Sequence, residues 1–159
     1  MAVLALARVY TVSVAITNPG AVTNLNLQAA ATKPLVLVRA KITLAQATIP
    51  AAANAAVELV RFTAAPTVTS IAASTFLNHD PTDADAAFTA GHTASAAGTV
   101  TDAYLEGWGS STGWIYDFAP TPEEYIVVPA GTANGIGLRH TTAPPAGVYR
   151  FLMTVHEIG

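Results

Sequence analysis

Side chains that could bind a metal ion or move a proton are few in this chain and lie far apart. The four histidines are His79, His92, His140 and His156, and no two of them have the short spacing of a paired metal-binding motif. The chain has no cysteine, so it has neither a thiolate ligand nor a thiol nucleophile. These residue types and spacings predict a protein without a zinc site.

Three carboxylates gather at Asp80, Asp83 and Asp85, and a hard cation such as calcium prefers oxygen ligands of this kind. The segment lacks the distal bidentate glutamate of a twelve-residue calcium loop. Pro81 and Thr82 follow Asp80, a combination that favours a turn. We therefore predict an acidic turn here, solvated and without a metal ion.

Motifs for phosphate binding and for paired carboxylates are incomplete. The glycine-rich residues 131–137 lack the Lys-Ser/Thr ending of a phosphate-binding loop and lie between two predicted strands. They predict a hairpin or a β-corner turn, with Asn134 and Gly135 suited to a positive φ. Glu123 and Glu124 are adjacent, so a strand would point them to opposite faces and keep them from acting as a pair.

Other catalytic arrangements also lack support. No G-x-S-x-G nucleophile elbow is present. A cupin-like enzyme is the remaining catalytic alternative, and it would need His140, His156 and Glu157 to meet on neighbouring strands. Nothing in their spacing predicts such a cluster. The sequence therefore predicts that the protein is not an enzyme and carries no cofactor.

The elements that position these residues are predicted to be β-strands. Large apolar side chains recur every second residue, as in Tyr10, Val12, Val14 and Ile16, which is the period of a strand with one buried face. The predicted strands are residues 9–16, 24–29, 35–44, 57–63, 99–105, 113–118, 125–128, 136–140 and 148–158. Gly, Pro and Asn separate them. This pattern predicts an all-β protein, an antiparallel β-sandwich of jelly-roll type.

The strand at residues 35–44 gives the most specific prediction of which side chains face the core. Its alternation predicts two faces. The core face is Val36, Val38, Ala40, Ile42 and Leu44, and the other face is Arg39, Lys41 and Thr43.

The length predicts a single domain over residues 1–159, with two segments outside the strand framework. The first is an apolar N-terminal arm at residues 1–7, which lacks the preceding basic region of a signal peptide. The second is a long loop excursion at residues 64–98, rich in Ala, Thr, Ser and Asp and without a sustained period. Between strands, the alanine-rich residues 50–56 have the composition of a short helical turn.

The composition points to contact with other subunits. Hydrophobic residues make up 52% of the chain, but 33 of its 159 residues are alanine and only 8% are aromatic. Charged residues are 11%, against roughly 25% in an average soluble domain. A net charge of −3 argues against nucleic-acid binding, and no apolar run is long enough for a membrane-spanning helix. We therefore expect part of the surface to be covered by partners.

The few aromatic residues are needed mostly for the core. Trp114 and Phe118 share one face of a predicted strand, and burial in the sandwich is the favoured interpretation for both. Trp108 lies between Gly107 and Gly109, and the sequence leaves two interpretations open for it. It is either a core residue or an exposed platform that stacks on a sugar ring.

The C-terminal half combines these features in a distinctive order. Trp114 lies on an aromatic strand, and Pro122-Glu123-Glu124, Ile126-Val127-Val128, Pro129-Ala130-Gly131 and finally Glu157 follow it. This succession of strand and turn types resembles the small jelly-roll proteins of tailed-bacteriophage virions, in particular capsid decoration or cement proteins. Residues 10–16 and 39–43 are similar in character to the early strands of those proteins.

The resemblance implies a structural virion protein that binds the outside of an icosahedral phage head as a homotrimer and stabilises it. Its partners would be the major capsid protein and further copies of itself, with no nucleic acid and no membrane. The implied capsid or subunit contacts lie in and beside the arm, at Val3, Leu4, Leu6 and Arg8. The alternative is a head-fibre or tail-associated module that binds a glycan or receptor, with Trp108 as its contact.

Overall fold

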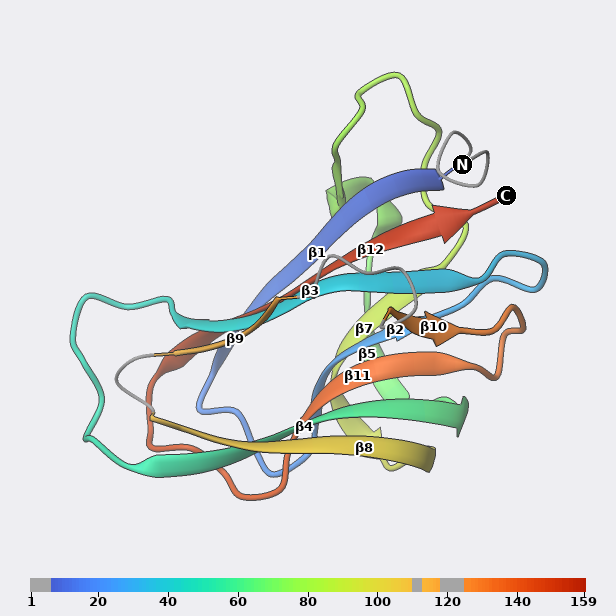
Figure 1. Ribbon diagram of the computed structural model, residues 1–159. Helices are drawn as coiled ribbons and strands as arrows, with labels where there is room; N and C mark the ends of the chain where they lie inside the picture. Colours follow the sequence, from blue (N-terminus) through green and yellow to red (C-terminus); the bar gives the residue numbers. More distant parts are fainter. Residues whose placement is uncertain (1–6, 110–112, 118–124) are drawn as a thin grey trace.

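The computed structural model describes residues 7–109, 113–117 and 125–159, which form two antiparallel sheets packed face to face (Figure 1). Sheet A has the strand order β10-β3-β12-β1-β6, and β9 also pairs with β3. Sheet B has the order β5-β7-β2-β11-β4-β8. The prediction of an all-β antiparallel sandwich is confirmed. Within the described part of the chain, no helix is long and apolar enough to cross a membrane.

The chain crosses repeatedly between the two sheets, as it does in a jelly roll. Sheet A contains β1 (Ala7–Thr17), β3 (Leu35–Leu44), β6 (Leu77–Asn78), β9 (Trp114–Asp117), β10 (Ile126–Val128) and β12 (Val148–Ile158). Sheet B contains β2 (Thr23–Gln28), β4 (Asn54–Ala64), β5 (Thr67–Ile71), β7 (Thr89–Ala96), β8 (Thr99–Gly109) and β11 (Gly135–His140). All nine predicted strands are present, within a few residues of their predicted bounds.

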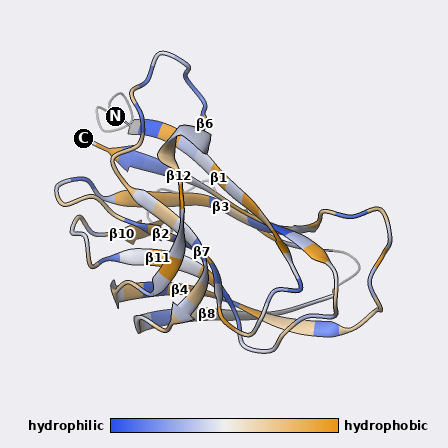
Figure 2. Ribbon diagram, turned by 180° about the vertical axis from the view of Figure 1, so that it is seen from behind, coloured by the Kyte–Doolittle hydropathy of each residue, from blue (hydrophilic) through white to orange (hydrophobic). Residues whose placement is uncertain are grey.

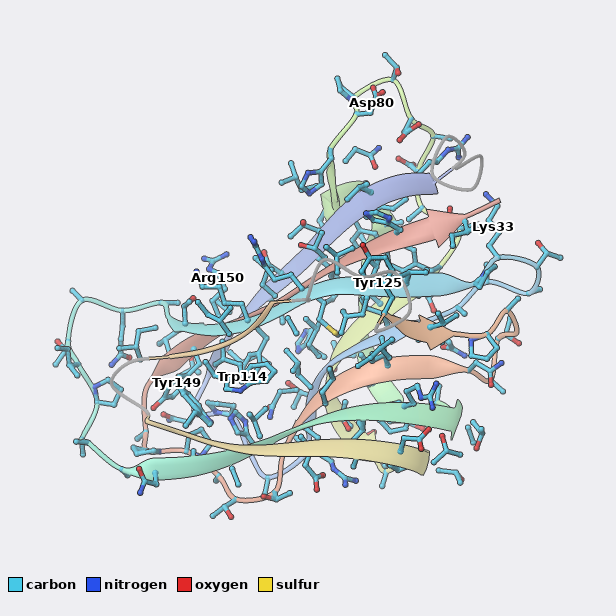
Figure 3. The ribbon with its side chains drawn as sticks, viewed as in Figure 1. Lys33, Asp80, Trp114, Tyr125, Tyr149 and Arg150 are labelled. Atoms are coloured by element: carbon cyan, nitrogen blue, oxygen red, sulfur yellow. The ribbon has the colours of Figure 1, made fainter. Side chains whose placement is uncertain are left out.

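The core lies between the sheets and is built from inward positions two residues apart. On β12 every second side chain from Tyr149 to Val155 is fully buried, and its neighbours point outward. Burying one such side chain stabilises the fold by about 1.5–3 kcal/mol. Trp114 is buried in the same core, as predicted, and Phe118 lies outside the described residues. Trp114 and Tyr149, labelled in Figure 3, both belong to this core.

A β-bulge in β3 corrects the predicted core face of that strand. Arg39 is opposite Thr154 and Leu37 is opposite Val155, so Val38 has no partner on β12. An unpaired residue shifts the alternation of side chains by one position. Leu37 is therefore fully buried on the core side before the bulge, and Ala40 is buried on that side after it. Val36 and Val38 therefore do not share one face with Ala40 and Ile42, so that prediction was wrong, although Val36 is itself buried at 6% exposed.

The excursion at residues 64–98 is largely extended. It contains β5, a 3-10 turn at Ala73–Thr75, β6 and β7. The β5–β7 pair extends sheet B beyond β2, and β6 pairs with β1 at the edge of sheet A. β7 carries small and polar side chains on both faces, and the apolar Val68 and Ile71 of β5 are three residues apart, so neither strand shows apolar alternation in the sequence. The excursion therefore adds strands to both sheets on the same side of the sandwich.

Two turn predictions have different outcomes. The alanine-rich residues 50–56 form no helical turn, because β4 already begins at Asn54 and Ala55 pairs with Trp108 of β8. The glycine-rich residues 131–137 connect β10 of sheet A to β11 of sheet B, which confirms a β-corner. The positive φ lies at Gly131, at 128°, and not at Asn134 or Gly135.

Candidate functional site

The four predicted contact residues are only partly described. Val3, Leu4 and Leu6 lie outside the described residues. Arg8 lies on β1, and its Nε is 3.6 Å from Oδ1 of Asp83 in the excursion. About a third of the Arg8 side chain is exposed, so this ion pair is only partly screened by solvent. In the protomer, Arg8 therefore helps to fix the excursion against sheet A.

The acidic segment is a projecting and well-braced loop. The backbone N–H and the hydroxyl of Thr82 donate to Oδ1 of Asp80 at 2.9 and 2.7 Å, which confirms the predicted turn. These hydrogen bonds hold the pKa of the Asp80 carboxyl below its usual value. Figure 3 shows Asp80 near the tip of a loop that stands clear of the sheets, and Figure 2 shows this loop as mainly hydrophilic. We call residues 80–85 the acidic loop.

The base of the acidic loop is tied to the strands beside it. The Tyr10 hydroxyl donates to the carbonyl of Ala84 at 2.8 Å, and the Asn78 amide donates to the carbonyl of Asp83 at 3.3 Å. The backbone N–H of His79 donates to the carbonyl of Val9 at 3.1 Å. Together with the Arg8 ion pair, these contacts fix where the loop leaves the sheet.

A buried carboxylate holds the C-terminal end of the excursion in place. Oε1 of Glu157 accepts hydrogen bonds from the backbone N–H groups of Ala87 and Phe88, at 2.9 and 3.0 Å. Its Oε2 lies 3.5 Å from Nζ of Lys33, and the Glu157 side chain is fully inaccessible to solvent. A carboxylate in this position needs all of these partners, because its charge is removed from water.

A second buried polar cluster lies at the opposite end of β12, around His140. The Asn24 amide donates to Nδ1 of His140 at 3.0 Å, and the His140 ring stacks on Trp108 with centroids 5.7 Å apart. The Phe151 ring meets His140 edge-on at 5.5 Å. Burial lowers the pKa of His140 to about 4, so this ring is neutral at physiological pH.

Trp108 is therefore a core residue. Its side chain is 5% exposed, and it also packs edge-on against Tyr149 at 5.8 Å. A platform that stacks on a sugar ring must present an exposed face. The position of Trp108 thus favours the core interpretation over the glycan contact of the alternative function.

The cupin-like ligand set is not brought together. His140 lies on β11 in sheet B, whereas His156 and Glu157 lie on β12 in sheet A. His156 and Glu157 are adjacent on one strand, and Glu157 points inward toward the excursion. No cluster of three or more His, Cys, Asp or Glu side chains that could hold a metal occurs among the described residues.

A groove opens between the sheets where β10 faces β4 and β8. It has a volume of about 330 Å³, and Leu59, Ile126 and Ile136 contribute apolar lining. Arg61 crosses this groove, since its Nη1 donates to the carbonyl of Val127 at 3.2 Å and its Nε donates to Asp102 at 2.9 Å. The guanidinium thus links sheet B to sheet A and is not available as a free anion-binding group.

The outward face of sheet A is the largest feature that sequence reasoning missed. Register and exposure place these side chains on it: Val9, Thr11, Ser13 and Ala15 of β1; Arg39, Lys41 and Thr43 of β3; Ile115 of β9; Val127 of β10; and Arg150, Leu152, Thr154 and His156 of β12. Five of these thirteen side chains are apolar, four carry a hydroxyl group, and none is a carboxylate. Interface centres are likewise depleted in Asp and Glu.

Large apolar side chains are also exposed at both edges of this sheet. Leu77 of β6 is 61% exposed, Ile115 of β9 is 53% exposed and Val127 of β10 is 43% exposed. The only signal for this surface in the sequence was the low charge of the chain as a whole, at 11%. The surface itself could not be assembled without the strand order.

Comparison of the chain with protein-family models, with curated proteins and with solved structures returns no match.

Proposed function

We propose that this protein is a structural virion subunit that decorates the outside of an icosahedral phage head. It acts as a homotrimer, binds the major capsid protein and stabilises the shell without covalent chemistry. The jelly-roll sandwich supplies a rigid body for this task. The proposal rests on the sequence resemblance together with the surface of sheet A.

The observation that carries the proposal is the combined outward face and edges of sheet A. This surface joins apolar and hydroxyl-bearing side chains with the exposed Leu77, Ile115 and Val127. Ile115 and Val127 lie on two strands that both pair with β3, and Leu77 lies at the opposite edge. Large exposed apolar side chains are enriched at protein interfaces, whose centres are depleted in Lys, Glu and Asp. A protein that clamps neighbouring subunits needs such a surface.

The use of charge inside the protomer supports the same function. Four ion pairs among the described residues are Arg8–Asp83, Lys33–Glu157, Arg61–Asp102 and Arg139–Glu58. They engage more than half of the seven basic residues in the chain. Few charges remain to keep the surface hydrated, which favours a protein covered in part by partners.

The glycan-binding alternative loses its main residue, because Trp108 is buried. A map of the virion tests the proposal directly. We expect density for this jelly roll on the outer capsid surface, in groups of three. Density confined to the tail or to a fibre would support the alternative instead.

The first prediction concerns the oligomeric state. We expect the purified protein, with a protomer mass of 16.3 kDa, to sediment as a trimer at micromolar concentration. The physical reason is the apolar surface of sheet A, which would otherwise be exposed to water. Sedimentation velocity at several concentrations measures this, and a monomer throughout that range would contradict the trimer.

The second prediction concerns the arm. Deleting residues 1–6 removes Val3, Leu4 and Leu6 and leaves β1 intact from Ala7, which pairs with Ile158. We expect attachment to phage heads to weaken by at least about tenfold, since one well-buried leucine accounts for a change of that size. The melting temperature should stay the same. Equal loss of attachment and of thermal stability would place the arm in the core.

A further inference from the structure

Two cations lie close together on the outward face of sheet A, and no counter-charge for them is present among the side chains that the structure describes. Lys41 is opposite Leu152, and Arg150 is opposite Thr43, so the two cations are diagonal neighbours on the same face. Such neighbours lie roughly 7–8 Å apart. Neither side chain makes an ion pair or hydrogen bond with any described residue. Arg39, two residues from Lys41 on β3, adds a third basic side chain to the same face. We call Lys41 and Arg150 the basic patch.

The surface around the basic patch suits contact with a protein. Ala15 is opposite Arg150, and Ser13 is opposite Leu152, so small side chains lie beside the cations on β1. Ile115 of β9 is opposite Lys41 and is 53% exposed. Figure 3 shows Arg150 on the side of sheet A away from the buried Trp114 and Tyr149. This part of sheet A presents two long basic side chains and one exposed apolar side chain. Such a surface is suited to bind an acidic segment that projects from its partner.

The chain itself carries such a segment. Asp80 and Asp85 of the acidic loop are exposed, and neither makes an ion pair within the described residues. The loop stands clear of the sheets, and its base is fixed by Arg8, Tyr10 and Asn78. A segment that is already ordered loses little conformational entropy when it binds.

The acidic loop cannot reach the basic patch of its own protomer. The loop is anchored through Arg8, which is opposite Glu157 near the end of β12, whereas Arg150 lies near the start of that strand. Seven residues of strand separate these positions, which is roughly 20 Å at about 3.3 Å per residue. The acidic loop of the same protomer therefore does not supply a counter-charge to Lys41 and Arg150, and only the loop of another copy can reach them.

We infer that the acidic loop of one copy docks on the basic patch of a second copy, with Asp80 and Asp85 facing Lys41 and Arg150. The two surfaces differ, so the contact is head-to-tail and repeats around a ring when the rotation closes. This inference rests on the proposed function only in requiring self-association. In this arrangement the basic patch binds a second copy of the protein. The rest of the outward face of sheet A and the N-terminal arm bind the capsid shell.

Charge reversal tests the contact. The patch variant carries Lys41→Glu and Arg150→Glu, the loop variant carries Asp80→Lys and Asp85→Lys, and a third variant carries all four substitutions. We expect each of the first two to raise the dissociation constant of the oligomer by at least about tenfold in low salt. The four-substitution variant should return to the wild-type oligomer, because the same pairs form with reversed sign.

A matched control places new acids on the other sheet, with Thr63→Glu and Thr99→Glu at exposed positions of β4 and β8. This variant should keep the wild-type oligomer. Circular dichroism confirms that each variant is folded before sedimentation velocity is measured. A patch variant that remains an oligomer, or a folded four-substitution variant that stays monomeric, overturns the contact.

The outcomes also separate this contact from the proposed function. If the patch variant keeps its oligomer but no longer binds phage heads, the basic patch faces the capsid, and the inference is wrong while decoration stands. If the wild-type protein trimerises and the charge reversals break only the trimer, the contact is supported independently of decoration.

Discussion

Replacing Glu157 by alanine is expected to destabilise the folded protein by about 3–5 kcal/mol, the range for breaking a buried and hydrogen-bonded charge pair. The substitution leaves the backbone N–H groups of Ala87 and Phe88 without their acceptor, and it removes the partner of Lys33. Chemical denaturation at a fixed protein concentration measures the loss, because the stability of an oligomer depends on its concentration.

The effect should be concentrated in the excursion. Amide hydrogen exchange is expected to accelerate at residues 79–88 in the Glu157→Ala protein, because that segment is held at one end by this carboxylate. Lys33→Met is the control, because it removes only the ion-pair partner of Glu157 and leaves both backbone hydrogen bonds to the carboxylate in place. It should cost roughly 1–3 kcal/mol, less than Glu157→Ala, because the buried carboxylate loses its ion-pair partner but keeps both backbone hydrogen bonds. Equal losses in the two variants would show that the backbone contacts contribute little.

The second large effect is a loss of stability in mild acid that depends on His140. Burial lowers the pKa of the His140 imidazole to about 4 in the folded protein, against 6.5 for an exposed histidine. Above pH 6.5 the ring is neutral in both states and has no effect on stability. As the pH falls from 6.5 to 4, the unfolded chain binds a proton that the folded protein does not. Stability therefore decreases across this window, by about 3 kcal/mol in total.

The His140→Asn variant isolates the contribution of His140 to this loss of stability. Its side-chain oxygen can accept the hydrogen bond that Asn24 now donates to Nδ1, and it does not titrate. We expect lower stability at pH 7, since ring packing against Trp108 and Phe151 is lost. The decline between pH 6.5 and 4 should become much shallower. An unchanged slope would assign the acid sensitivity to other groups, such as the carboxylates.

His156 provides a comparison on the outward face. Burial, and secondarily the nearby charge of His79, lower the pKa of His156 as well. His156 is less buried than His140, so its substitution should change the pH dependence less. Measuring the pH dependence of stability in the variants at His140 and at His156 separates the contribution of the core histidine from that of the surface histidine.

The strand framework could be predicted because each strand carries its own signal. Residues 35–44 and 148–158 match β3 and β12 at both ends, since a half-buried strand alternates large apolar side chains with others. The excursion strands had no such signal. β7 carries small and polar side chains on both faces, and β5 has no apolar alternation. They are strands because β5 pairs with β7 and β7 pairs with β2.

The candidate contact surface was predicted only as a property of the composition. The shortage of charge was visible in the sequence, but its location depends on which strands are neighbours. Likewise, nothing beside Trp108 indicates whether it is exposed, because its burial comes from His140 and Tyr149, which are distant in the chain. The basic patch exists only because β3 pairs with β12.

By itself, the sequence determined that the protein is an all-β sandwich with a charge-poor composition, because side-chain period and charge content are local properties. The tertiary structure decided the rest. The bulge at Val38 is defined against β12, and Glu157 is buried because the excursion returns to it from some seventy residues earlier in the chain. These features depend on long-range pairing, whose partners a local pattern does not specify.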